Sequence, residues 1–222
     1  MSTSRISGEK TAERDAIVRA ALPNVPFDGW TQKTLVEAAG AAGLKGSIPR
    51  LFPGGPTDAV AHFMDMADRA LAEDLKAQDL SALKIRAKVA LGVRLRLERW
   101  TPHREAVRRA LALTPHPAVA GHVLQNWYRV VDLIWRAAGD KSVDFNFYTK
   151  RGLLAAVYGA TMLHWLDDRS EGCAGTWAFL DRRIEDVMQV PKIKSKITER
   201  LKVFPNPLEL VIKAAARLRA VR

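Results

Sequence analysis

The residues that most often carry catalysis are few in this chain and poorly spaced for it. His116 and His122 stand six positions apart across a proline-containing break, and the sequence has no His-Glu-x-x-His segment or paired cysteines of the kind that bind zinc. Cys173 has no nearby histidine to activate it, and no Gly-x-Ser-x-Gly turn or phosphate-binding glycine loop is present. His164 precedes two aspartates, a group typical of a solvated helix end. We therefore expect no catalysis, no metal site and no cofactor.

Composition narrows the class of protein. The chain has 222 residues, 48% of them hydrophobic, which is enough to bury a helical core. The single cysteine rules out an internal disulfide, and the N-terminal Met-Ser-Thr-Ser-Arg lacks the apolar run of a secretory signal. Basic residues or histidines interrupt the most apolar stretches, so none approaches the roughly 18 apolar residues of a membrane span. These features favour a cytoplasmic protein that does not cross a bilayer.

Two basic segments account for most of the positive charge. The net charge is +11, and residues 81–109 and 191–222 each contain nine basic and two acidic side chains. Residues 1–50 contain seven basic and five acidic side chains. A strongly basic chain calls for an acidic partner, either nucleic acid or an anionic membrane surface. Because the excess lies outside the N-terminal segment, its placement favours the membrane.

The hydrophobic pattern predicts helices almost throughout, with proline and glycine as punctuation and no sustained period-2 alternation. Thr31 is a plausible N-cap for the second helix, and Ser81 can cap a later one. Pro191 should end the last long helix before a separate terminal one. About ten helices are expected, near residues 10–21, 31–43, 47–52, 56–78, 81–100, after 102, 118–138, 146–168, 175–189 and from 207 onward.

The last segment predicts an amphipathic basic helix. Asn206 can cap it and Pro207 can be its first residue. At 100° per residue an apolar stripe faces away from Lys213 and Arg217, which suits a helix lying in a membrane interface. The alternative is that the stripe packs on the protein's own body or on a dimer mate. The candidate membrane-binding residues are Leu208, Val211, Ile212, Lys213, Ala215, Arg217 and Leu218.

The first fifty residues resemble the helix-turn-helix region of TetR proteins, most clearly over residues 38–52 and 57–60. A DNA-reading helix needs exposed polar side chains at its start, and this one offers only Lys45, Ser47 and Arg50. Pro49 also removes a backbone amide there. The region is therefore interpreted as a degenerate helix-turn-helix that packs on the rest of the protein, and no nucleic-acid partner is expected.

An aromatic and basic string is the most distinctive part of the sequence. Residues 144–151 read Asp-Phe-Asn-Phe-Tyr-Thr-Lys-Arg, residues 177–183 read Trp-Ala-Phe-Leu-Asp-Arg-Arg, and residues 27–31 read Phe-Asp-Gly-Trp-Thr. With these segments the chain resembles the lipid-binding accessory proteins of ubiquinone biosynthesis, the family of the ninth Coq protein and its proteobacterial relatives. The resemblance covers most of residues 29–187.

This resemblance implies a TetR-like fold with three parts: a degenerate helix-turn-helix region at 1–55, a lipid-binding and dimerisation domain at 56–190, and a basic amphipathic segment at 191–222. It implies a homodimer through the late helices. It also implies a partner, the di-iron monooxygenase that hydroxylates demethoxyubiquinone. The residues carried over to that contact are Asp144, Asn146, Phe147, Tyr148 and Arg151.

The spacing of these residues supports a contact surface in part. Phe147, Arg151 and Leu154 stand at i, i+4 and i+7, so we expect aromatic and cationic groups on one outward face of the helix. The alternative is that Phe145, Phe147 and Tyr148 are ordinary core residues at a helix start. Phe147 stands where many relatives have Trp, which keeps the apolar contact and removes an N–H donor.

The resemblance further implies an apolar cavity that holds a lipid or an isoprenoid quinone precursor. Large apolar residues of the late helices are the candidates for its wall, although each is equally suited to an ordinary core. The candidate lipid-binding residues are Trp127, Leu133, Trp135, Leu153, Val157, Met162, Trp165, Trp177 and Leu180.

Three classes of function follow. The favoured one is a non-catalytic protein, peripheral to the inner membrane, that presents ubiquinone precursors to the hydroxylase. The second is a TetR-type transcriptional regulator with a lipid ligand, which would bind duplex DNA through residues 31–52 in a salt-sensitive way. The third is a structural adaptor with an empty core.

Overall fold

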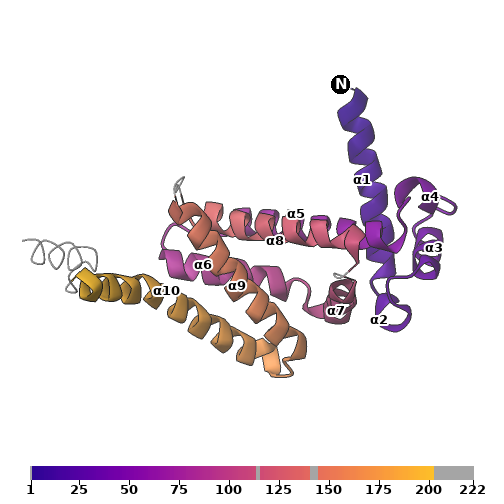
Figure 1. Cartoon of the computed structure of the whole chain (residues 1–222). Coiled ribbons are helices and arrows are strands. Elements are labelled where there is room, and N and C mark those ends of the chain that lie inside the picture. The colour runs from indigo at the N-terminus through magenta and orange to yellow at the C-terminus, as the bar shows by residue number, and fades with distance from the viewer. Residues whose placement is uncertain (1, 114–115, 141–144, 203–222) are drawn as a thin grey trace, which may run out of the picture. The chain divides into compact units, whose positions relative to one another are not determined.

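The computed structural model describes residues 2–113, 116–140 and 145–202, and within these ranges the chain forms helices and no strand (Figure 1). The all-α prediction of about ten helices is confirmed. The helices are α1 (Ser2–Ala21), α2 (Val25–Asp28), α3 (Gln32–Ala41), α4 (Ile48–Leu51), α5 (Pro56–Ala77), α6 (Ile85–Glu98), α7 (Arg104–Ala112), α8 (Pro117–Ala137), α9 (Phe145–Asp167) and α10 (Ala174–Lys202).

The chain divides into two compact units, Met1–Asp181 and Arg182–Arg222. The first contains α1 to α9 and the start of α10, and the second contains the rest of α10. Short 3-10 turns at Thr101–His103 and Glu171–Cys173 lead into α7 and α10.

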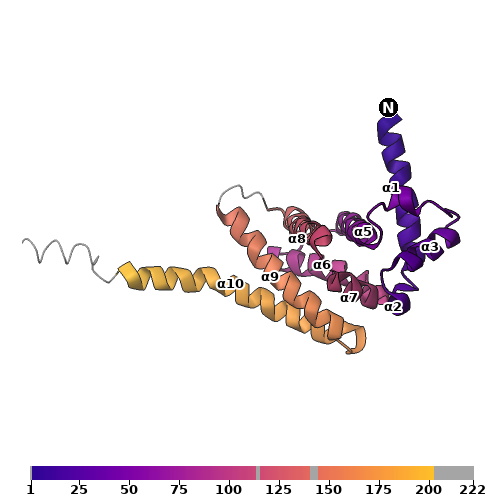
Figure 2. The ribbon, with the colours of Figure 1, turned by 45° about the vertical axis from the view of Figure 1, so that its right-hand side comes forward.

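At one end of the first unit, α1 packs against α3, α4 and α5 (Figure 2). As predicted, Thr31 caps α3, because its hydroxyl accepts a hydrogen bond from the Thr34 amide at 3.2 Å. His62 on α5 is only 4% exposed, and its Nε2 lies 2.6 Å from Asp15 Oδ1 on α1. This buried pair joins the N-terminal helices to the long helix α5.

The body of the first unit is built on α5 and α8, which pack side by side, with α6 and α9 against α8. Gly92 allows α6 to approach α8 closely, since a Cβ at this position would lie 2.9 Å from Ile134 Cγ1. Val130, Val131 and Ile134 of α8 are fully or almost fully buried. The inner face of α8 is therefore tightly packed against α6.

A buried polar cluster joins three of these helices. Asp68 on α5 is 6% exposed and lies 3.2 Å from Arg96 Nη2 on α6. From α8, Asn126 Nδ2 and Arg129 Nε donate to Asp68 Oδ2 at 2.8 and 3.0 Å, and Arg129 also pairs with Asp65. Burial raises the pKa of the Asp68 carboxyl, and the two nearby arginines oppose that rise.

Several predicted boundaries differ from the structure. The break expected at residues 23–26 contains the short helix α2. Ser81 does not cap a helix, because its amide and hydroxyl hydrogen bond to Asp79 in a turn and α6 begins only at Ile85. The prediction that Pro191 ends a helix is also wrong: α10 continues through it to Lys202. A proline costs a helix one hydrogen bond locally and does not stop its neighbours from being helical.

Replacing Asp68 by Ala should lower the free energy of unfolding by about 3–5 kcal/mol, because Arg96 would remain buried without its counter-charge. The matched control is Asp74→Ala, which breaks the more exposed pair between Asp74 and Arg99 and should cost less than about 1 kcal/mol. Urea denaturation followed by circular dichroism measures both. Equal losses for the two variants would contradict the role assigned to Asp68.

Candidate functional site

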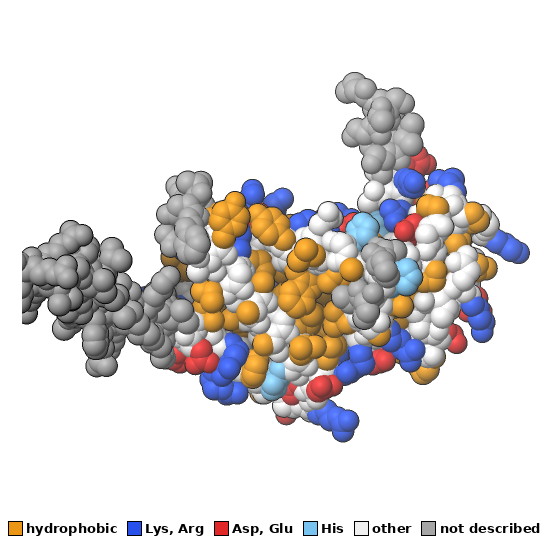
Figure 3. All heavy atoms as spheres, in the orientation of Figure 1, with side chains coloured by type: hydrophobic (Ala, Val, Ile, Leu, Met, Phe, Trp, Pro, Cys, Tyr) orange, Lys and Arg blue, Asp and Glu red, His pale blue; other side chains and the backbone are white. Residues whose placement is uncertain are grey.

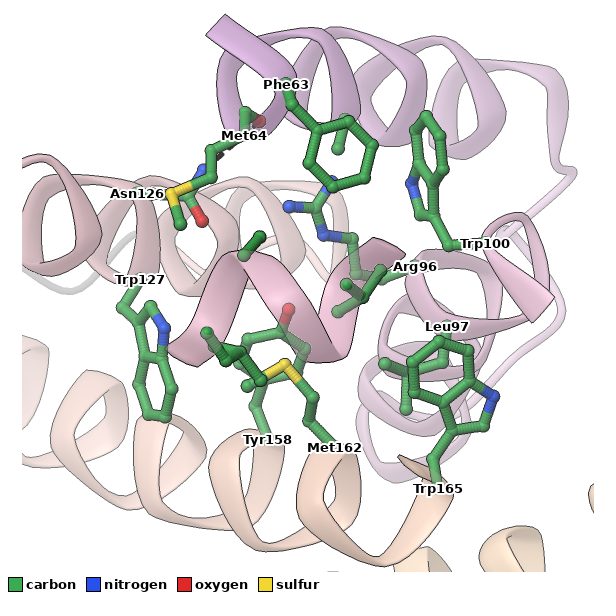
Figure 4. Close-up of a pocket in the computed structure, with 14 residues that line it drawn as sticks. Phe63, Met64, Arg96, Leu97, Trp100, Asn126, Trp127, Tyr158, Met162 and Trp165 are labelled. Atoms are coloured by element: carbon green, nitrogen blue, oxygen red, sulfur yellow. Dashed lines mark hydrogen bonds between the residues drawn. The ribbon is translucent and has the colours of Figure 1, made fainter. Parts of the chain in front are cut away.

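A small, partly open cavity lies in the first unit among α5, α6, α7, α8 and α9 (Figure 4). Its volume is about 50 Å³, and most of its wall is apolar. Among its lining residues, Arg96 and Asn126 both contact Asp68. The lining residues are Phe63, Met64, Ala67, Arg96, Leu97, Trp100, Val107, Ala110, Leu111, Asn126, Trp127, Tyr158, Met162 and Trp165.

The wall contributed by α8 and α9 depends on a glycine. The Trp127 ring covers Gly159, where a Cβ would lie 2.6 Å from Trp127 Cη2. The same indole meets the Tyr158 ring edge-on at a centroid distance of 5.6 Å. Because Gly159 has no side chain, α9 can lie close to Trp127 and complete the cavity wall.

The size of the cavity limits what it accepts without rearrangement. Ligand pockets in proteins usually enclose about 300–1,000 Å³, and a dry cavity of about 150 Å³ holds benzene. The observed volume of about 50 Å³ lies below both values, so a ligand of that size needs the wall to move. Met64 and Met162 line it, and unbranched thioether side chains repack easily, so these two residues provide the room for widening.

Three of the nine predicted lipid-binding residues, Trp127, Met162 and Trp165, line this cavity. The other six do not. Val157 and Leu180 are buried elsewhere in the first unit, and four are partly exposed: Leu133, Trp135, Leu153 and Trp177.

The lining residues contributed by α5, α6, α7 and the turn between α6 and α7 were not predicted from the sequence. Phe63, Arg96 and Trp100 are far from α9 along the chain, and only the folded arrangement brings them together. Arg96 was a weak indication of a polar group in the interior, because it is the one charged residue among the buried positions of α6.

A second feature lies at the start of α9, where Arg151 is only 6% exposed and is bound by two carboxylates. Its Nη2 donates to Asp132 Oδ1 of α8 at 2.7 Å, and its Nη1 donates to Asp140 Oδ2 of the following loop at 3.2 Å. Lys150 Nζ donates to the other oxygen of Asp140 at 2.8 Å. These ion pairs fix the first turns of α9 against α8.

The predicted partner-binding residues divide into inward and outward positions. The Arg151 guanidinium carbon lies 3.4 Å from the centroid of the Phe147 ring, and the Phe147 and Tyr148 rings meet edge-on at 5.1 Å. Tyr148 is 70% exposed. The expectation that Arg151 shares an outward face with Phe147 is wrong, because Arg151 is buried in its ion pairs. Asn146 lies in the first turn of α9, and Asp144 lies outside the described residues.

Hydrophobic side chains gather on the face formed by α8 and α9 (Figure 3). Leu124 and Tyr128 of α8 are 74% and 50% exposed, and Leu163 of α9 is 62% exposed. These exposed apolar side chains lie on the helix pair that also walls the cavity.

The predicted membrane-binding residues Leu208, Val211, Ile212, Lys213, Ala215, Arg217 and Leu218 lie outside the described residues. Among the helices that are described, none has an apolar stretch long enough to cross a bilayer. The same part of the chain has no group of three or more His, Cys, Asp or Glu side chains arranged to hold a metal ion.

The fold defines the class of protein. A TetR transcriptional regulator from Nitrosomonas europaea ATCC 19718 matches this structure with a TM-score of 0.65 and 19% sequence identity, over 79% of this chain and 97% of that one. The chain therefore has the TetR-like fold, and at this level of identity the likeness concerns the fold alone.

The family follows from the sequence. Residues 120–191 match the COQ9 family model. The chain is 35% identical to the ubiquinone biosynthesis protein COQ9, mitochondrial, of Drosophila melanogaster, over 83% of this chain and 58% of that one. It is 33% identical to the Homo sapiens protein of the same name, over 78% and 57%. The chain belongs to the COQ9 family, and it spans less than two thirds of the length of these relatives.

Gly159→Ala should displace the Trp127 ring and lower the free energy of unfolding by about 1–3 kcal/mol, since the new methyl group overlaps the indole. The control on the same helix is Gly152→Ala, where no atom lies within 4 Å and the helix should gain about 0.5–1 kcal/mol. Denaturation midpoints and tryptophan fluorescence measure the effect. If both alanines behave alike, the Trp127–Gly159 packing is not as described.

Proposed function

We propose that this protein is a non-catalytic, lipid-binding accessory protein of ubiquinone biosynthesis, which holds an isoprenoid quinone precursor and presents it to the di-iron demethoxyubiquinone hydroxylase at a membrane surface. The observation that carries the proposal is the extent of the COQ9 match. Residues 120–191 include α9 and most of α8, and this helix pair carries both a wall of the cavity and the exposed Tyr148.

The cavity supports a role in binding rather than in reaction. Its wall contains aromatic rings, aliphatic side chains and two methionines, a surface suited to an isoprenoid or another apolar ligand. Two of its polar side chains, Arg96 and Asn126, contact Asp68, and neither is a nucleophile. The lining residues include no His, Asp, Glu, Lys or Cys.

The start of α9 supports a partner contact centred on Tyr148. Exposed tyrosines on a rigid support are common in interface hot spots, because they bury a large area at low entropic cost. Here the support is the Phe147 ring, stacked on an Arg151 guanidinium that two carboxylates hold in place. Arg151 thus acts as a positioning residue, and Tyr148 is the residue available for contact with the hydroxylase.

The apolar face of α8 and α9 supports the proposed homodimer. Leu124, Tyr128 and Leu163 are exposed there, and the interface core of homodimers is more apolar than the rest of a protein surface. The proposed contact with anionic lipid concerns the helix predicted from Pro207 onward. It rests on the basic amphipathic sequence pattern of residues 206–222.

A TetR-type regulator is the alternative function, and the geometry of the N-terminal helices disfavours it. The candidate reading helix α4 is a single turn, with Ile48 and Leu51 buried. Its cation Arg50 donates to Glu13 at 2.8 Å, so the side chain is engaged within the protein. Little remains on this helix to read base edges.

The proposed ligand is tested by native mass spectrometry with lipid extraction, on protein purified from a ubiquinone-producing host. We expect a dimer with a bound quinone intermediate or other isoprenoid lipid. Lipid-free protein that shifts duplex DNA would favour the regulator, and lipid-free protein that does not bind DNA would favour the adaptor.

Tyr148→Ala should reduce co-purification of the hydroxylase at least about tenfold, because an interface hot spot contributes about 2 kcal/mol or more. Stability should change little, since the side chain is 70% exposed. The control is Phe27→Ala, which removes an 82% exposed aromatic ring from α2. Affinity capture followed by mass spectrometry gives the readout. Unchanged capture by a folded Tyr148→Ala variant would refute the assignment of this surface.

A further inference from the structure

Three residues that line the cavity carry hydrogen-bond donors without an acceptor. Arg96 Nη1, Trp100 Nε1 and Trp165 Nε1 are buried without a hydrogen-bond partner, and all three residues line the cavity. Their exposed fractions are 7%, 9% and 0%. Buried N–H groups in proteins almost always have a partner, so three unpaired donors on lining residues require an explanation.

Arg96 and Trp100 are held so that their free donors lie in one region. Arg96 keeps its position because its Nη2 lies 3.2 Å from Asp68 Oδ1. The Trp100 ring is packed edge-on against Phe63 at a centroid distance of 4.9 Å. In Figure 4 the Trp100 nitrogen lies on the side of its indole turned toward the Arg96 guanidinium.

Trp165 is placed differently. Its ring is packed under the Arg104 guanidinium, whose carbon lies 5.0 Å from the ring centroid, and in Figure 4 its nitrogen lies on the side of the ring away from Arg96. In this view the Trp100 nitrogen faces the Arg96 guanidinium and the Trp165 nitrogen does not, so we take Arg96 and Trp100 as the donor pair and Trp165 as apolar wall.

We propose that Arg96 and Trp100 form an acceptor-binding subsite, which holds a neutral carbonyl, ether or phenol oxygen of the ligand at the α5–α6 side of the cavity. The apolar remainder of the ligand lies toward Trp127, Tyr158 and Met162. This assignment rests on the proposed lipid-binding function and adds the chemistry and the orientation of the ligand.

The chemistry of the donors selects an acceptor. An indole N–H and a guanidinium can only donate hydrogen bonds. Asn126, the other polar lining residue, has its donor engaged with Asp68 and with the Met64 carbonyl. The two unpaired donors therefore favour a ligand oxygen that accepts hydrogen bonds, such as a carbonyl, ether or phenol oxygen.

The charge balance selects a neutral ligand. Two carboxylates, Asp65 and Asp68, face two guanidiniums, Arg96 and Arg129, so the cluster behind the subsite has no net charge. A carboxylate or phosphate placed against Arg96 and Trp100 would add a negative charge that this cluster does not compensate, which is unfavourable. A fatty acid or a phospholipid headgroup is accordingly a poor occupant.

Water is the competing occupant. A water molecule needs about 10–15 Å³ of such volume, and the cavity of about 50 Å³ has room for more than one. An oxygen-bearing ligand displaces this water and replaces its hydrogen bonds, with Met64 and Met162 moving to admit the attached ring.

The test compares two neutral probes of equal chain length, decyl-1,4-benzoquinone with acceptor oxygens and decylbenzene without them, by isothermal titration calorimetry on the full chain. The wild type should bind the quinone more tightly. Trp100→Phe keeps an aromatic ring and removes the N–H, so it should lower the ratio of quinone to decylbenzene affinity about 5- to 10-fold.

Two matched variants serve as controls. Trp165→Phe changes a tryptophan that lines the cavity. Trp135→Phe changes a tryptophan outside the cavity, whose Nε1 donates a hydrogen bond to the Lys150 carbonyl at 3.1 Å. Neither should change the affinity ratio. Decanoic acid is a third probe and should bind more weakly than the quinone at neutral pH.

The outcomes separate this subsite from the proposed function. If decylbenzene binds but the quinone is not favoured, or if Trp100→Phe leaves the ratio unchanged, the donors serve ordered water only and the subsite is refuted while lipid binding stands. If neither neutral probe binds, both proposals fail. Tighter binding of decanoic acid than of the quinone overturns the neutral-acceptor assignment.

Discussion

Burial of the Asp68 carboxylate is the constraint on which the arrangement of the helix body depends. A charge at this depth is tolerated only with cations and hydrogen-bond donors around it, and these come from two other helices, Arg96 from α6 and both Asn126 and Arg129 from α8. The cluster therefore sets how α5, α6 and α8 align. It leaves Nη1 of the cavity-lining Arg96 unpaired, so a structural ion pair and the proposed subsite share one side chain.

The same physical rule operates at the start of α9, where Arg151 is buried against Asp132 and Asp140. There the buried Arg151 supports the exposed ring of Tyr148 instead of a cavity. Helix α9 contributes to both features: Tyr148 is exposed near its start, and Tyr158 and Met162 line the cavity further along. A shift of α9 relative to α8 therefore changes the proposed contact surface at Tyr148 and the cavity together.

The sequence predicted what local chemistry determines and missed what depends on distant parts of the chain. Helix order followed from proline and glycine, and Thr31 was recognised as a cap because capping acts over three residues. The rotation of α9 about its own axis could not be predicted. Phe147, Arg151 and Leu154 share one face of the helix, but their spacing does not say whether that face lies against water or against α8. Likewise, Trp127 and Trp165 were plausible wall residues, whereas Phe63 and Trp100 become their neighbours only through the tertiary fold.

The wall of the cavity comes from five helices, and this has a kinetic consequence for the proposed ligand. A ligand larger than the present volume of about 50 Å³ enters and leaves as packed side chains move, and collective motions of packed helices take microseconds to milliseconds or longer. The dissociation rate of the ligand then follows the motion of the helices rather than its solubility in water. Residence time in such a site is a property of the protein, and a contact that shifts α9 can shorten it without changing a single atom of the cavity wall.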